Sequence, residues 1–328
     1  MLQSLLALGR PLLADGATGT NLFEVGLTSG DNPELWNDSQ PAKIKALHQS
    51  FVDAGADIIL TNSFGGNRRR LMLHNLEGRT RELNAKAAGN ARAVADAAPR
   101  KVIVAGSVGP TGDLLAPLGP LGEDEAAEVF IEQIEGLKMG GADVIWIETM
   151  SAPEEIRAAA RAAIACAMPY TVTASFDTVG KTMMGVAPAA LAEFVAGLSP
   201  GPLAFGANCG VGAADLLMSV LAMAEAAPGA AIIAKANAGI PQWHGAHIHY
   251  SGTPELMADY AGLALDAGAR IVGGCCGTKP AHLAAMRKAI DAHVAGRRPG
   301  LAEVEAALGP LVAPPSAGAP AARTRRRG

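Results

Sequence analysis

The sequence predicts a single-domain (β/α)8 TIM barrel on three observations. Short apolar runs alternate eight times with longer helical patterns. The apolar runs are nearly continuous, which is typical of parallel strands that are buried on both faces. Eight strand-then-helix units in about 300 residues also have the size of such a barrel. The alternative that these patterns leave open is a doubly wound open sheet.

The predicted elements follow one another in a regular order. The strands are LLADGA near Leu12, ADIILTNSF from Ala56, KVIVAGSVG from Lys101, ADVIWIETM from Ala142, YTVTASFD from Tyr170, LAFGANCG from Leu203, AIIAKANAG from Ala231 and ARIVGGCCG from Ala269. Helical periodicity separates them, as at Phe130, Ile134 and Leu137. The predicted helix-start signals are Ser151 with Glu154, Thr253 before Pro254, and Thr278 before Lys279.

Charge and cysteine content narrow the class of protein. A net charge of −4 gives no electrostatic basis for binding nucleic acid or an anionic membrane. No apolar run approaches the roughly 18–20 residues of a membrane span, and the N-terminus is interpreted as a lead-in to the first strand rather than a signal peptide. The chain has only four cysteines, too few for a disulfide framework, so we expect a reducing, cytoplasmic location.

The domain organisation is simple. We expect residues 1–300 to form the barrel and residues 301–328 to form a disordered C-terminal tail, which is rich in Pro and Ala from Gly309 onward. The sequence leaves a homo-oligomer open.

Three of the four cysteines fall at predicted strand ends, where such a barrel carries its chemistry. Cys209 ends the sixth strand, and Cys275 and Cys276 end the eighth. Thiolates from two loops make a zinc site with one open coordination position, and soft sulfur ligands favour zinc. The alternatives are buried inert cysteines and a vicinal disulfide. Cys166, in an Ala-rich helix, is interpreted as a packing residue.

An open zinc position can activate water or bind a substrate thiol. Water activation usually accompanies histidine and carboxylate ligands, so three sulfurs favour a thiol substrate, which a metal deprotonates. Asp15 and Glu148, at the ends of the first and fourth strands, could bind an amino-acid ammonium group, and capping or acid–base roles stay equally open. Two rival hypotheses are a Schiff-base aldolase that uses Lys235 and a barrel that only stores zinc.

The segment IPQWHGAHIHY contains three of the seven histidines, His244, His247 and His249. A second metal site there is one hypothesis. A surface loop that leads into Thr253 is the favoured interpretation.

Several motifs together resemble one known family. They are LADGATGT, TNSFGGNRRRL, GSVGPTGD, IET, GANCG, KANAGIP, YSGTPELMADY and IVGGCCGTKPAHLAAM. From Leu13 to about Ile290 the chain resembles the homocysteine S-methyltransferase family, most closely its bacterial betaine–homocysteine group. The same module forms the first domain of cobalamin-dependent methionine synthase. The resemblance implies a (β/α)8 barrel that moves a methyl group from betaine to homocysteine, giving methionine and dimethylglycine. The alternative donors are S-methylmethionine and a methylcorrinoid carried by a partner protein.

The resemblance also implies a role for each matching residue. Zn²⁺ would be held by Cys209, Cys275 and Cys276, with Asn237 as a candidate for the fourth position. The homocysteine amine would be held by Asp15 and Glu148, the two residues expected to serve catalysis. Its carboxylate would lie near Gly16, Ser107 and Val108.

The donor pocket departs from the family pattern. A quaternary ammonium group is usually held by aromatic faces, and the resemblance points to Trp36 and Phe64. However, Gly65 and Thr149 stand where animal betaine enzymes have tyrosines. Trp243 and Tyr250 are candidates to replace those rings, and for Trp36 a packing role is equally open.

Overall fold

Eight parallel strands form a ring in the computed structural model, which describes residues 2–244 and 247–312, those at 241–244 and 247–249 by their backbone only. The strands are β1 (Leu12–Leu13), β2 (Ile58–Leu60), β3 (Ile103–Val108), β4 (Val144–Met150), β5 (Tyr170–Ala174), β6 (Phe205–Cys209), β7 (Ile232–Ala236) and β10 (Ala269–Gly274). They pair in the order β1-β10-β7-β6-β5-β4-β3-β2. Ala14 closes the ring by bridging to Ile58, and the Asp57 amide donates to the Leu13 carbonyl at 2.7 Å. The predicted barrel is confirmed over the open sheet.

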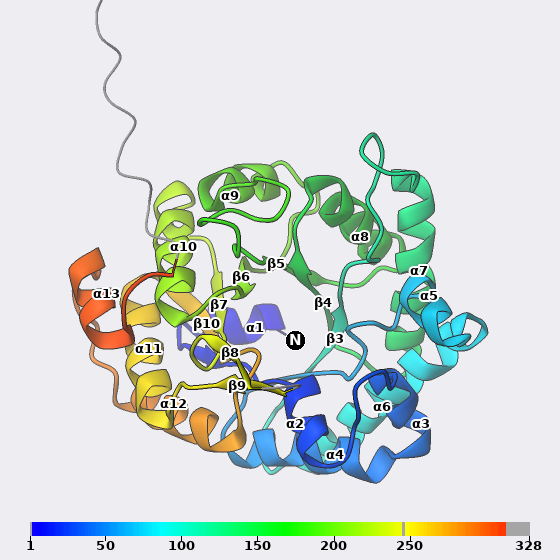
Figure 1. The fold of residues 1–328 in the computed structure, drawn as a ribbon, viewed down its shortest axis with the longest axis horizontal. Coiled ribbons are helices and arrows are strands. Elements are labelled where there is room, and N and C mark those ends of the chain that lie inside the picture. The colour runs from blue at the N-terminus through cyan, green and yellow to red at the C-terminus, as the bar shows by residue number, and fades with distance from the viewer. Residues whose placement is uncertain (1, 245–246, 313–328) are drawn as a thin grey trace, which may run out of the picture.

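Helices surround this ring, and each strand is followed by one that packs on its outer face (Figure 1). The main outer helices are α4 (Pro41–Asp53), α6 (Thr80–Ala97), α7 (Glu123–Met139), α8 (Pro153–Ala165), α9 (Pro188–Ala196), α10 (Ala213–Ala226), α11 (Pro254–Asp266) and α12 (Pro280–Ala292). Shorter pieces are α1 (Leu2–Ala7), α2 (Gly19–Glu24), α3 (Trp36–Ser39), α5 (Arg68–Leu71), α13 (Leu301–Leu308) and the 3₁₀ turns at Pro33–Leu35, Met72–His74 and Glu77–Arg79.

Two hydrophobic cores explain why the strands are apolar on both faces. The inner core fills the barrel with side chains such as Leu12, Ile103, Trp146 and Ile233, and Leu2 of α1 packs against them. Figure 1 shows α1 within the outline of the ring. The larger outer core lies between the strands and the surrounding helices. Because the apolar strand side chains meet one core or the other, the strand sequences do not alternate.

Three local expectations are wrong. Residues Leu301–Leu308 of the expected tail form helix α13, whose Val304 is buried in the outer core; residues 313–328 lie outside the described part. Helix α8 begins at Pro153 after an Ala152 N-cap, so Ser151 does not cap it. Helix α12 begins at Pro280 after a Lys279 N-cap, and Thr278 Oγ1 has no hydrogen-bond partner among the described residues, so Thr278 does not cap it. The Thr253 cap of α11 is confirmed by its bond from Leu256 N.

The histidine-containing segment is not a simple loop. Its backbone forms two antiparallel strands, β8 (Pro241–His244) and β9 (His247–Tyr250), beside the barrel mouth (Figure 1). The side chains of Trp243, His244, His247 and His249 lie outside the described residues, so a metal role for them stays a hypothesis.

No helix within residues 2–244 and 247–312 combines the length and the apolar character that crossing a membrane requires.

Gly206 tests the packing between β6 and β7. A Cβ atom there would lie 1.9 Å from the Ile233 carbonyl oxygen, so Gly206→Ala must push the two strands apart. We expect it to lower the free energy of unfolding in urea by about 1–3 kcal/mol. The control is Gly89→Ala in α6, where the space is open and alanine favours the helix by about 1 kcal/mol. Equal unfolding midpoints for Gly206→Ala and the native protein would contradict this account of the barrel wall.

Candidate metal centre

Three cysteine sulfurs meet at the C-terminal rim of the barrel. The Sγ atoms of Cys209, Cys275 and Cys276 all lie within 4.8 Å of one another, and the three residues are half-buried. The strand order explains this meeting, since β7 alone separates β6 from β10. The Cys275 amide donates to the carbonyl of Ala236, at the end of β7, which holds the three strand ends together. The predicted convergence of the three cysteines is confirmed.

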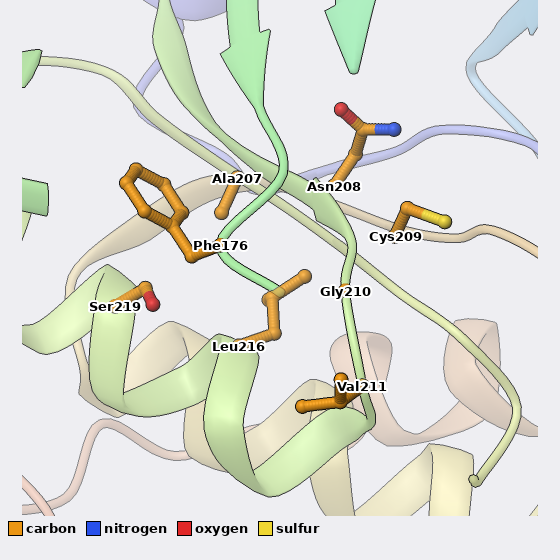
Figure 2. Close-up of a pocket in the computed structure, with 8 residues that line it drawn as sticks. All are labelled: Phe176, Ala207, Asn208, Cys209, Gly210, Val211, Leu216 and Ser219. Carbon is orange, nitrogen blue, oxygen red and sulfur yellow. The ribbon is translucent and has the colours of Figure 1, made fainter. Parts of the chain in front are cut away.

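Cys209 reaches this cluster through a strained backbone. Its φ of 62° is left-handed, which is uncommon for any residue except glycine. Strand alternation alone would send Asn208 and Cys209 to opposite faces. Figure 2 instead shows both side chains on one side of β6, with Ala207 on the other. The crevice drawn there, behind the strand, is too narrow for a water molecule. Strain of this kind concentrates at functional sites.

The vicinal pair depends on the glycines around it. A Cβ on Gly274 would collide with the Thr278 side chain, and one on Gly277 would lie 2.3 Å from the Tyr250 ring. The Thr278 amide donates to the Cys275 carbonyl, which closes a tight turn around the two cysteines. All four cysteines are free in this structure, which contains no vicinal disulfide between Cys275 and Cys276. Cys166 is buried in the outer core, and its predicted packing role is confirmed.

The chemistry of the three sulfurs fits a soft dication. Hydrogen bonds from Cys209 and Cys275 lower the pKa of Cys276, whereas the same contacts raise the pKa of Cys209. The hydrogen bonds within the cluster therefore favour a negative charge on Cys276 over one on Cys209. Three thiolates this close together require a positive ion, and thiolates select zinc-like metals.

Asn237 offers an oxygen beside the cluster. Its Nδ2 donates to the Gly210 carbonyl at 2.8 Å, next to Cys209. Its Oδ1 is buried and accepts no hydrogen bond from the residues that the structure describes. A buried oxygen without a donor is costly, and a metal ion would satisfy it. Asn237 as a fourth ligand stays a prediction that these contacts support.

Asn208 was not among the predicted site residues, although it orders the site. Its Oδ1 accepts from the Thr149 amide at 2.8 Å and from Thr173 Oγ1 at 2.7 Å. Its Nδ2 donates to Thr149 Oγ1 and approaches Cys275 Sγ at 3.8 Å. Thr149 has a left-handed φ of 61°, like Cys209. Asn208 thus joins the two strained strand ends of β4 and β6 to the sulfur cluster. Its position beside Cys209 in GANCG was the only sequence signal.

Asp15 is paired inside the barrel mouth. Its Oδ1 accepts from Lys235 Nζ at 2.8 Å and its Oδ2 from the Leu60 amide at 2.7 Å. Burial tends to lower the pKa of Lys235, but the carboxylates of Asp15 and Glu148 outweigh it and raise that pKa. A Schiff-base lysine must be neutral to attack, so the ion pair with Asp15 argues against the aldolase hypothesis. The ion pair itself was missed, because sequence does not show which strand ends face one another.

Glu148 is the second carboxylate of the mouth. The Ser107 hydroxyl donates a hydrogen bond to Glu148 Oε1. The Ser107 amide donates to Thr61 Oγ1 at 3.0 Å. Burial, opposed by Lys235 and reinforced by Cys275, raises the pKa of Glu148 to about 7. Ser107 therefore orients Glu148 in this structure.

The other predicted carboxylate neighbours are backbone features. Gly16 lies tightly against the Thr278 carbonyl and the Phe51 ring, where a Cβ would not fit. The Val108 side chain is fully buried in the outer core, so only its main chain could face a ligand.

The two predicted donor aromatics, Trp36 and Phe64, have different surroundings. Trp36 packs against a small cluster around Leu22 and Ile44, and Lys43 Nζ lies 4.6 Å from the centre of its ring. This supports the packing interpretation of Trp36. Phe64 is 40% exposed and lies against Gly109.

The loop after Phe64 is closed by a buried acid. Glu34 Oε1 accepts from the Gly65 amide at 2.6 Å, and a Cβ on Gly65 would lie 3.0 Å from that oxygen. A side chain at this position would have to move Glu34. Tyr250 is half-buried, and its hydroxyl forms a hydrogen bond with Cys276.

Comparison with known proteins agrees with this geometry. Two curated relatives are the methionine synthases of Mycobacterium tuberculosis, 31% identical over 297 residues, and Mycobacterium leprae, 30% identical over 298. Each match covers 86% of this chain, which spans about a quarter of those proteins (25% and 24%).

A solved structure and a family model extend the comparison. The metallated form of the homocysteine methyltransferase MmuM from Escherichia coli superimposes with a TM-score of 0.70 at 26% identity, covering 88% of this chain and 99% of that one. The homocysteine S-methyltransferase family model matches residues 12–290. This model covers most of the chain, including the three convergent cysteines, and the chain therefore belongs to the homocysteine S-methyltransferase family.

Proposed function

We propose that the protein is a zinc-dependent methyltransferase that moves a methyl group from betaine to the thiol of homocysteine, giving methionine and dimethylglycine. The observation that carries this proposal is the cluster of three sulfurs within 4.8 Å at the barrel mouth. Zinc held by Cys209, Cys275 and Cys276 would bind the homocysteine sulfur and favour loss of its proton. Asn237 is the candidate that fills the fourth position before substrate arrives.

The substrate's other groups have partners at the same rim. Glu148 presents a carboxylate to the homocysteine ammonium group, and Ser107 keeps that carboxylate oriented. The homocysteine carboxylate would face the backbone near Gly16 and Val108. These contacts fix the thiol at one end and the amine at the other, so the sulfur enters the reaction with little remaining freedom.

The transfer itself is a direct displacement. The homocysteine sulfur attacks one methyl carbon of betaine and forms an S–C bond. The C–N bond breaks, and its electron pair stays on nitrogen as dimethylglycine leaves. Phe64, which is exposed, and Tyr250, which is half-buried, are the candidates to present aromatic faces to the quaternary ammonium group.

A second donor is favoured by one observation. Lys43 lies over the Trp36 ring, and a cation in that place competes with a second cation. If Trp36 is unavailable for this reason, a methylcorrinoid carried by a partner protein becomes the alternative donor. S-methylmethionine is itself a sulfonium cation and would meet the same competition as betaine.

A donor panel tests the proposed function. Zinc-loaded protein is incubated with homocysteine and, separately, betaine, S-methylmethionine or methylcobalamin, and methionine and dimethylglycine are measured. We expect equal amounts of both products with betaine. Cys276→Ala should abolish turnover, whereas the matched control Cys166→Ala, outside the cluster, should keep it. Methionine from another donor alone would overturn the betaine assignment, and none from any donor would overturn methyl transfer.

The acidity of Glu148 predicts a pH dependence. Its pKa is raised to about 7 by burial, so below that pH the protonated group no longer attracts an ammonium ion. We expect KM for homocysteine to rise as pH falls through about 7, and Glu148→Gln to remove this rise. Thiol ionisation affects the native protein and the variant alike. Steady-state KM between about pH 6 and pH 8 gives the answer, and identical profiles for both proteins would refute the assignment.

A further inference from the structure

We propose that Lys235 commits Asp15 to an internal ion pair, so that Glu148 alone selects the ammonium group of the substrate. This inference rests on the proposed function and makes Lys235 a specificity-determining residue. It departs from the expectation that Asp15 and Glu148 share the amine.

Asp15 has little left to offer a ligand. Its side chain is 1% exposed, and each carboxylate oxygen already accepts a hydrogen bond, one from Lys235 and one from Leu60 N. Lys235 Nζ also approaches the Asp15 carbonyl at 3.3 Å. A substrate ammonium ion would have to displace a buried lysine that is 2% exposed. Breaking a buried ion pair leaves an uncompensated charge, which is strongly unfavourable.

The barrel is shaped to hold this lysine. Lys235 lies on β7 and Asp15 follows β1, with β10 between them in the strand order. The lysine side chain crosses β10 at Gly273, where a Cβ atom would lie 3.1 Å from Lys235 Cγ and 3.0 Å from Ala14 Cβ. Glycine at that position leaves the path open. The Trp146 ring lies 5.7 Å from Lys235 Nζ on the interior side.

Glu148 differs from Asp15 in both exposure and bonding. It is 8% exposed, and Ser107 is the donor that the described residues give to Oε1. No described residue donates to its second oxygen, so that oxygen can accept from a ligand. The charges agree with this assignment. Asp15 and Lys235 cancel, which leaves one negative charge on Glu148 to match one ammonium group.

The experiment compares homocysteine with 4-mercaptobutanoate, which lacks the amino group. Dissociation constants of both thiols are measured by calorimetry on the zinc-loaded native protein, on Glu148→Gln and on the paired variant Asp15→Asn/Lys235→Met, which removes both charges together. We expect the native protein to prefer homocysteine by about 10- to 100-fold, the range of one charged hydrogen bond. Glu148→Gln should lose that preference, and the paired variant should keep it within about threefold.

Two results overturn the inference. One is a paired variant that loses the preference as Glu148→Gln does. The other is a Glu148→Gln protein that keeps a preference above about threefold, since Asp15 would then share the amine. This second comparison decides the matter even if the paired variant does not fold. Native protein that binds neither thiol would refute the proposed function and the inference with it, whereas an altered pattern of preference refutes the inference alone.

Discussion

The close approach of three sulfurs across β6, β7 and β10 is the constraint on which the rest of this structure depends. In a closed parallel barrel all strand ends point to one rim, so residues 66 positions apart in sequence, Cys209 and Cys275, become neighbours. Bringing thiols together is unfavourable once they ionise, because like charges repel. The left-handed backbone at Cys209 and the glycines around Cys275 and Cys276 maintain this arrangement, and a thiophilic cation would stabilise it.

Polar side chains around the cysteine cluster connect it to neighbouring strand ends. Asn208 links the strand ends of β4 and β6 and approaches Cys275, so the sulfur cluster is tied to the strand that carries Glu148. The buried Asp15–Lys235 pair adds two cancelling charges to the interior of the mouth. Under the inference above, one carboxylate, Glu148, remains for an ammonium group. The proposed substrate, an amino-acid thiol, would then place its sulfur at the cysteine cluster and its amine at Glu148.

How far the sequence could predict this site depends on the range of each interaction. The eight strands and the cysteine cluster were predictable, because continuous apolar runs mark buried parallel strands and strand ends share one rim. The ion pair of Lys235 with Asp15 was not, since it depends on how the lysine crosses Gly273 of β10. Helix α13 was hidden by a Pro- and Ala-rich tail, although Val304 anchors it in the outer core. Trp36 matched a family position, but its neighbours Ile44 and Lys43 place it in a local cluster.

The central claim, that the three sulfurs share one metal and admit a substrate thiol beside it, is tested most directly by X-ray absorption at the zinc edge. Zinc-loaded protein should show three sulfur ligands, with the remaining position filled by a lighter atom, and homocysteine should raise the sulfur count to four. A first shell made mainly of nitrogen or oxygen, or a sulfur count that homocysteine leaves unchanged, would contradict the account.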